Sequence, residues 1–224
     1  MLNRIFDSMG TVVSVSYDET TSSNEATNLT KTVFDIFDRF DHEFSTYRED
    51  SFISRINAKL SEPVDISDEA ISVFEVAEQY RVSTDGHFDI INPEGSTDPS
   101  GIVKAYAIKE AGHYLDSMGV TGWGLNAGGD ILISAVGNEF HSGIVNPSNK
   151  QELISDVMLG SPFVSLATSG YSERGNHIWN PRGVSSDVIQ ASVISDDIIF
   201  SDVMATVLIA GGISALQWLS LIHI

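Results

Sequence analysis

Residues 166–183 read Leu166-Ala167-Thr168-Ser169-Gly170-Tyr171-Ser172-Glu173-Arg174-Gly175-Asn176-His177-Ile178-Trp179-Asn180-Pro181-Arg182-Gly183. The apolar start of this stretch predicts a strand, and the Thr-Ser-Gly run predicts a turn at its end. A basic residue and one His-Ile pair then lead into a loop bounded by Pro181. Polar side chains therefore gather at one strand end, which is typical of a functional site and not of a core.

Short apolar runs separated by turn residues flank this stretch. They lie at 140–145, 153–159 and 163–167 before it and at 188–194 after it, and they predict an antiparallel meander. Further upstream, apolar runs at 123–126 and 131–136 enclose Ala127-Gly128-Gly129-Asp130. This arrangement predicts a tight hairpin, and its two glycines would also let the backbone approach a ligand closely.

The first half of the chain has helical periodicity. Apolar residues recur at three- and four-residue steps from Leu29 to Phe44, after N-cap candidates at 22–24. The same reasoning predicts helices at 52–57, at 67–82, from the Asp98-Pro99-Ser100-Gly101 turn to about 118, and from about 199 onward. Residues 6–17 predict one strand with a bulge at Met9-Gly10-Thr11. Helices early, strands late and a long final helix indicate an α+β fold.

Composition limits the partners of this chain. Its 224 residues predict one compact domain over 1–224, and Lys+Arg of 12 against Asp+Glu of 31 give a net charge of -19. That charge and the lack of a basic run argue against nucleic acid and anionic membranes. No cysteine is present, which excludes disulfides and thiolate metal sites. We also expect no signal peptide, no membrane span of ~20 apolar residues, and a cytoplasmic location.

Two features carry candidate chemistry by residue type and spacing. Lys104 lies in the first turn of the helix that the turn at 98–101 opens, where unpaired N–H groups favour a phosphate, although many helices begin this way. Asp202 and Thr206 are spaced i, i+4 and share one helical face. Two hard oxygens suit Mg²⁺ or Ca²⁺. The pattern alone leaves open an exposed Asp beside a Thr that bonds back into its own helix.

Six segments occur in an order that resembles the ApbE family, the FAD:protein FMN transferases. They are Met9-Gly10-Thr11, Phe44-Ser45-Thr46-Tyr47-Arg48, Asp98 to Tyr106, Asn126-Ala127-Gly128-Gly129-Asp130, Thr168 to Arg182, and Asp202-Val203-Met204-Ala205-Thr206. Together they span nearly the whole chain.

The resemblance implies a single T-fold-related α+β domain with an antiparallel sheet and packed helices. It also implies a Mg²⁺-dependent reaction that splits FAD, releases AMP and attaches FMN through a phosphoester to an acceptor protein. The acceptor would present a Thr or Ser in a Ser/Thr-Gly-Ala-Thr type of site. The family pattern makes His177 the catalytic base and gives Mg²⁺ three ligands, Asp202, Thr206 and the main chain near Gly101. FAD contacts are implied at Met9, Tyr47, Asp98, Ser100, Lys104, Gly128, Gly129, Asp130, Ser169 and Arg174.

Two other functions fit the same resemblance. One is a Mg²⁺-dependent FAD pyrophosphatase that releases FMN and AMP to water, and the other is a protein that binds FAD without chemistry. The binding protein is motivated by Ala105 in place of a usual Gly, Asn180 in place of a usual Asp, and the short C-terminal tail. The loop after Arg182 is also shortened relative to the family pattern. The family also continues into one more strand, so we consider a truncated or altered C-terminus. Ser169 lacks the G-x-S-x-G elbow of a nucleophile and is interpreted as part of a ligand-holding turn.

Overall fold

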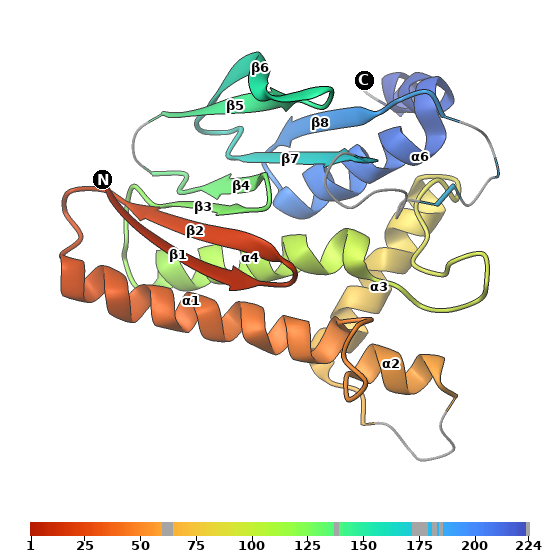
Figure 1. The fold of residues 1–224 in the computed structure, drawn as a ribbon, viewed down its shortest axis with the longest axis horizontal. Helices are drawn as coiled ribbons and strands as arrows, with labels where there is room; N and C mark the ends of the chain where they lie inside the picture. Colours follow the sequence, from red (N-terminus) through yellow and green to blue (C-terminus); the bar gives the residue numbers. More distant parts are fainter. Residues whose placement is uncertain (60–64, 137–138, 172–178, 181–182, 184–185, 223–224) are drawn as a thin grey trace.

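The computed structural model describes residues 1–59, 65–136, 139–171, 179–180, 183 and 186–222 (Figure 1). Its strands are β1 (Leu2–Ser8), β2 (Thr11–Tyr17), β3 (Gly124–Ala127), β4 (Asp130–Ile133), β5 (Phe140–Asn146), β6 (Asn149–Leu159), β7 (Ser165–Gly170) and β8 (Gln190–Ser195). Its helices are α1 (Ser23–Phe44), α2 (Phe52–Asn57), α3 (Asp68–Ser83), α4 (Ser100–Ser117) and α6 (Ile198–Ile222). The predicted α+β class is confirmed.

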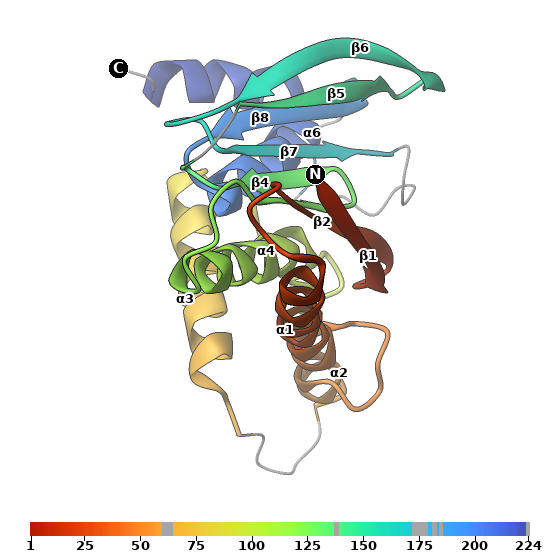
Figure 2. The same ribbon diagram turned by 90° about the vertical axis from the view of Figure 1, so that its left-hand side faces the viewer.

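The strands form a six-stranded sheet of order β1-β2-β3-β4-β7-β8 and a separate two-stranded ribbon, β5-β6. All the pairings are antiparallel. The prediction of one continuous meander is therefore wrong, because β7 pairs with β4 and not with β6. Residues 149–156 of β6 are exposed, so this strand cannot supply a buried face to the main sheet. The ribbon lies beyond β8 in both views, where Gln190 Nε2 donates a hydrogen bond to Val145 O at 3.0 Å (Figures 1 and 2).

The sheet contains two tight hairpins, and the sequence identified one of them. The β3-β4 turn is confirmed at Gly128 and Gly129, with φ of 62° and 95°. The predicted strand over residues 6–17 is instead a hairpin of β1 and β2, turning at Met9 (φ 51°) and Gly10 (φ 68°). Positive φ at both central residues is the hairpin geometry that matches strand twist. The expected bulge is therefore a turn.

Helices α1, α4 and α6 pack against the six-stranded sheet and against one another in sequence order. Figure 2 shows α1 and α4 side by side below the strands, with α3 reaching away. Alternate residues of β2 are fully buried toward the helices, namely Val13, Val15 and Tyr17. Ser22, one of the three predicted N-cap candidates, caps helix α1, and the structure adds a capping box between Ser22 and Glu25.

Helix α6 corrects one expectation about membranes. Residues Ile198–Leu216 are long and apolar enough to cross a membrane, whereas no such stretch was expected. However, 72% of this window is buried inside the fold, where α6 packs against β7, β8 and α4. These contacts are typical of a helix in the core of a folded domain. The helix kinks at Gly212, where φ is 57° and ψ is -142°.

Candidate functional site

A cavity of about 490 Å³ lies where the end of β7 meets α4 and α6. This volume is within the usual range of small-molecule sites. The cavity is lined by the turns of both hairpins, the start of α4, one face of α6 and the inner side of the ribbon. Segments far apart in the sequence therefore converge on one hollow.

A buried ion pair supports the side of the cavity formed by α4. Lys104 Nζ lies 2.6 Å from Asp130 Oδ2, and their side chains are 16% and 0% exposed. Asp130 Oδ1 also accepts a hydrogen bond from Thr168 N at 3.1 Å, so this carboxylate connects β4, α4 and β7. Lys104 and Thr168 line the cavity, whereas Asp130 lies outside its lining residues. The structure therefore places Asp130 as a buried support for Lys104.

The start of α4 also faces the cavity. Asp98, Ser100 and Gly101 all line it, and Asp98 Oδ1 accepts a hydrogen bond from Ser100 N at 3.0 Å. That bond satisfies one of the N–H groups that a helix start leaves open. Asp98 is held in turn by its own N–H, which donates to Ile90 O at 2.7 Å. Ala105, the departure from the family pattern, is fully buried in the core, so it does not crowd the cavity.

The turns of the two hairpins touch at the cavity. Gly128 N donates to Val12 O at 3.2 Å, and Gly129 N donates to Asn126 Oδ1 at 3.0 Å. A Cβ on Gly128 would lie 2.5 Å from Thr11 Oγ1, so only glycine permits this approach. Gly10, Thr11, Gly128 and Gly129 line the cavity, while Met9 packs against the core.

Asp202 and Thr206 come from α6 and line the same cavity. Asp202 is 5% exposed, so the alternative of a solvent-exposed acid is wrong. Thr206 Oγ1 lies 3.1 Å from Ser169 Oγ of β7. Among the described residues no group of three or more His, Cys, Asp and Glu gathers. One carboxylate, one hydroxyl and the main chain of Gly101, which lines the same cavity, are hard oxygen donors suited to Mg²⁺, which usually keeps waters and takes substrate phosphate oxygens.

The other predicted residues are placed differently. Tyr47 lies between α1 and α2, is 96% exposed and is not among the lining residues. Ser169 lines the cavity from within β7, so the predicted Thr168-Ser169-Gly170 turn is the end of a strand. His177 and Arg174 lie outside the described residues. The contacts implied for Tyr47, His177 and Arg174 stay predictions.

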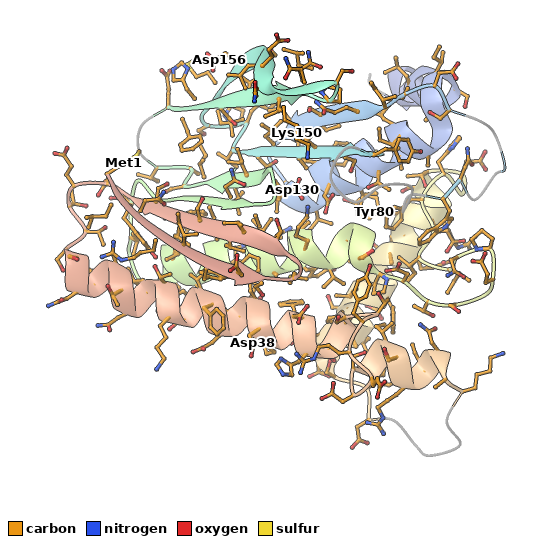
Figure 3. All side chains as sticks on the ribbon, in the orientation of Figure 1. Met1, Asp38, Tyr80, Asp130, Lys150 and Asp156 are labelled. Carbon is orange, nitrogen blue, oxygen red and sulfur yellow. The ribbon has the colours of Figure 1, made fainter. Side chains whose placement is uncertain are left out.

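Several lining residues were missed in the sequence. Lys150 and residues 142–147 come from the ribbon, and Figure 3 shows Lys150 directed from the ribbon toward the sheet. The turn Asn146-Pro147-Ser148-Asn149 separates two of the predicted apolar runs, but no local signal placed it over a cavity. His87 also lines the cavity and is only 4% exposed, packed so closely on Gly211 that a Cβ there would lie 2.5 Å from His87 Nδ1. Its packing partner lies on α6, which sequence proximity cannot reveal.

An aromatic pair backs the cavity at Phe88. The ring of Tyr80 meets that of Phe88 edge-on, with centroids 6.3 Å apart. Burial raises the pKa of Tyr80 to about 12, with the charge of Asp197 adding to the shift. Tyr80 is therefore neutral at physiological pH and serves as packing behind Phe88, which lines the cavity.

The sequence is similar to known proteins over most of its length. The model of the ApbE family matches residues 9–93 and 91–223. A relative named FAD:protein FMN transferase, from Vibrio cholerae, is 23% identical over 91% of this chain and 79% of its own length.

Three solved structures have the same fold. The ApbE protein of Thermotoga maritima has a TM-score of 0.81 and 19% identity, covering 99% of this chain and 89% of its own. Flavinyl transferase ApbE of Pseudomonas stutzeri has a TM-score of 0.76 and 18% identity, covering 98% of this chain and 88% of its own. Flavin transferase ApbE of Vibrio cholerae has a TM-score of 0.75 and 19% identity, covering 93% and 86%. With the family model spanning nearly all of the sequence, the chain belongs to the ApbE family.

Proposed function

We propose that this protein is a Mg²⁺-dependent FAD:protein FMN transferase. The observation that carries the proposal is one cavity lined by Lys104, Asp202, Thr206 and the glycine turn 128–129 in a chain of the ApbE family. A cation, hard metal ligands and accessible backbone are what a pyrophosphate needs in a protein of net charge -19.

The proposed reaction replaces the phosphoanhydride bond of FAD with a phosphoester bond to the acceptor. The hydroxyl oxygen of an acceptor Thr or Ser attacks the phosphorus on the flavin side of FAD. The bond from that phosphorus to the bridging oxygen breaks, and AMP leaves with the oxygen and the electron pair. The hydroxyl proton passes to a base, for which His177 is the candidate from the sequence, because imidazole is a side chain suited to general-base catalysis.

Asp202 and Thr206 are the residues that would hold Mg²⁺, with the main chain near Gly101 as a third donor. When bound, the cation neutralises charge that develops on the pyrophosphate oxygens. Lys104 of α4 adds a positive charge to the same cavity, in a position held by the buried Asp130 carboxylate. The carboxylate keeps the Lys104 ammonium oriented before any ligand arrives, which lowers the reorganisation needed in the reaction.

The proposal is tested by incubating the protein with FAD, Mg²⁺ and a peptide-tagged acceptor that carries a Ser/Thr-Gly-Ala-Thr site. We expect a fluorescent band at the acceptor on a denaturing gel and one AMP released per label. The matched control is the same acceptor with the modified Thr replaced by Val, which should stay dark.

Two outcomes would point to the other functions. Stoichiometric FMN and AMP in solution with no labelled acceptor would identify a pyrophosphatase. FAD that binds at equilibrium but is not consumed would identify a binding protein. Either result contradicts the transferase proposal.

A further inference from the structure

Two serines of β7 face α6 on either side of Asp202. Ser165 and Ser169 are four residues apart in a strand, so their side chains lie on the same face of the sheet. Ser165 contacts Ser201 and Ser169 contacts Thr206. The two contacts therefore flank Asp202 along the helix.

The contact at the buried end is part of a closed cluster of hydroxyls. Ser165 Oγ lies 2.9 Å from Ser201 Oγ and 3.2 Å from Ser195 Oγ, and Ser195 Oγ lies 2.7 Å from Ser201 Oγ. Ser165 and Ser201 are fully buried, and Ser195 is 8% exposed. Hydroxyls buried in this way cost free energy unless they are hydrogen-bonded, so the cluster fixes the position of α6 against β7 and β8. Ser201 directly precedes Asp202.

The contact at the cavity end involves a proposed metal ligand. Thr206 can offer a lone pair to a cation only when its own proton points elsewhere, because a hydroxyl has one proton and two acceptor lone pairs. Ser169 Oγ, 3.1 Å from Thr206 Oγ1, is placed to accept that proton. Partners that orient metal ligands in this way raise the affinity of metal sites.

We propose that Ser169 and Ser165 are positioning residues for the cation site, acting through Thr206 and through the register of α6. This inference rests on the proposed Mg²⁺ site and gives Ser169 a role different from the flavin contact that the family resemblance implies. Ser169 acts directly on one ligand. Ser165 acts indirectly, through Ser201 and the position of α6. Its effect is the smaller one, because the contact between Ser195 and Ser201 remains when the Ser165 hydroxyl is removed.

The test measures Mn²⁺ binding to the protein by electron paramagnetic resonance without FAD, then the Mg²⁺ and FAD dependence of turnover. We expect Ser169→Ala to weaken Mn²⁺ binding about tenfold, the lower end of the effect of such partners. Its turnover should recover at high Mg²⁺, with the KM for FAD unchanged. Ser169→Thr keeps the hydroxyl and should bind Mn²⁺ like the parent. Ser165→Ala should weaken binding less than Ser169→Ala does.

Ser134→Ala is the matched control for lost stability. Ser134 is a buried serine whose Oγ donates to Val136 O at 2.8 Å, and neither residue lines the cavity. Its loss should lower the thermal midpoint without changing the Mn²⁺ affinity. An equal loss of Mn²⁺ affinity in Ser134→Ala would mean that destabilisation alone explains the serine variants.

Further outcomes separate this inference from the proposed function. A parent protein that binds Mn²⁺ and a Ser169→Ala variant that binds it equally, with a raised KM for FAD, would overturn the positioning role alone. Ser169 would then be a flavin contact. A parent that binds no Mn²⁺ and cleaves FAD in EDTA would overturn the metal site as well.

Discussion

The two sides of the cavity are held in different ways. The inner wall consists of Lys104 and Thr168, which share the fully buried Asp130 carboxylate. The outer wall consists of residues 142–147 and Lys150 of the ribbon. Among the described strands, the ribbon pairs with none of the main sheet, and residues 149–156 are exposed.

This difference separates preorganised chemistry from an adaptable cover. Buried, hydrogen-bonded charges keep their geometry before a ligand binds, which is how electrostatic catalysis avoids reorganisation. Elements with few buried contacts open at low free-energy cost. We therefore infer that the inner wall determines both stability and turnover, whereas the outer wall affects only how well the ligand is held.

The largest expected effect on stability is at the inner wall. Asp130→Ala leaves the Lys104 ammonium without its buried carboxylate and should lower the free energy of unfolding by about 3–5 kcal/mol. Urea unfolding followed by circular dichroism measures this loss. The double variant Lys104→Met/Asp130→Leu removes both charges and should recover most of the stability but no FAD turnover. A loss below about 1 kcal/mol in Asp130→Ala would show that the pair is not a buried support.

A smaller effect is expected where the two hairpins meet. Gly128→Ala combines a left-handed backbone with a Cβ contact on Thr11 and should cost about 1–2 kcal/mol from the backbone alone, plus the clash. Gly129→Ala meets no atom within 4 Å and should cost less. Adding Thr11→Ala should restore part of the stability of Gly128→Ala and none of that of Gly129→Ala. If Thr11→Ala changed the stability of Gly128→Ala and of Gly129→Ala equally, the Cβ of Gly128→Ala would not clash with Thr11.

The smallest effect is expected at the outer wall. Lys150→Ala should raise the KM for FAD about three- to fivefold. The reason is that a solvent-exposed ion pair, here between Lys150 and a phosphate of FAD, contributes up to about 1 kcal/mol. The kcat and the urea midpoint should not change, and Lys150→Arg should behave like the parent at low salt. The difference in KM between Lys150→Ala and the parent should shrink as ionic strength rises. A fall in kcat or in stability would place Lys150 with the inner wall and remove the contrast between the two.

Local signals in the sequence predicted the elements that depend on local chemistry. The caps Ser22, Ser51 and Ser67 mark the starts of α1, α2 and α3, and each accepts a backbone hydrogen bond there. The Gly128-Gly129 pair marked the β3-β4 turn correctly. The i, i+4 spacing of Asp202 and Thr206 placed both on the cavity face of α6.

Signals that depend on distant partners were missed. Met9 adopts a positive φ in a turn, although methionine is not a typical turn residue. The sequence therefore predicted one strand where the structure has β1 and β2. Strands β4 and β7 pair although the whole ribbon lies between them in the sequence, and no local pattern specifies this pairing. Asp130 was identified by its motif, but its contact with Lys104, 26 positions earlier in the sequence, exists only after folding.

We propose above all that Asp202 and Thr206 hold the cation on which FAD cleavage depends. AMP release from FAD, followed over a range of Mg²⁺ concentrations and in EDTA, tests it in the parent and in Asp202→Ala. We predict no release in EDTA and a loss of about 1,000-fold or more in Asp202→Ala, because a bound cation contributes several kcal/mol to the barrier. Equilibrium binding of FAD should persist in the variant without Mg²⁺. Undiminished, Mg²⁺-dependent AMP release by Asp202→Ala would contradict the assignment.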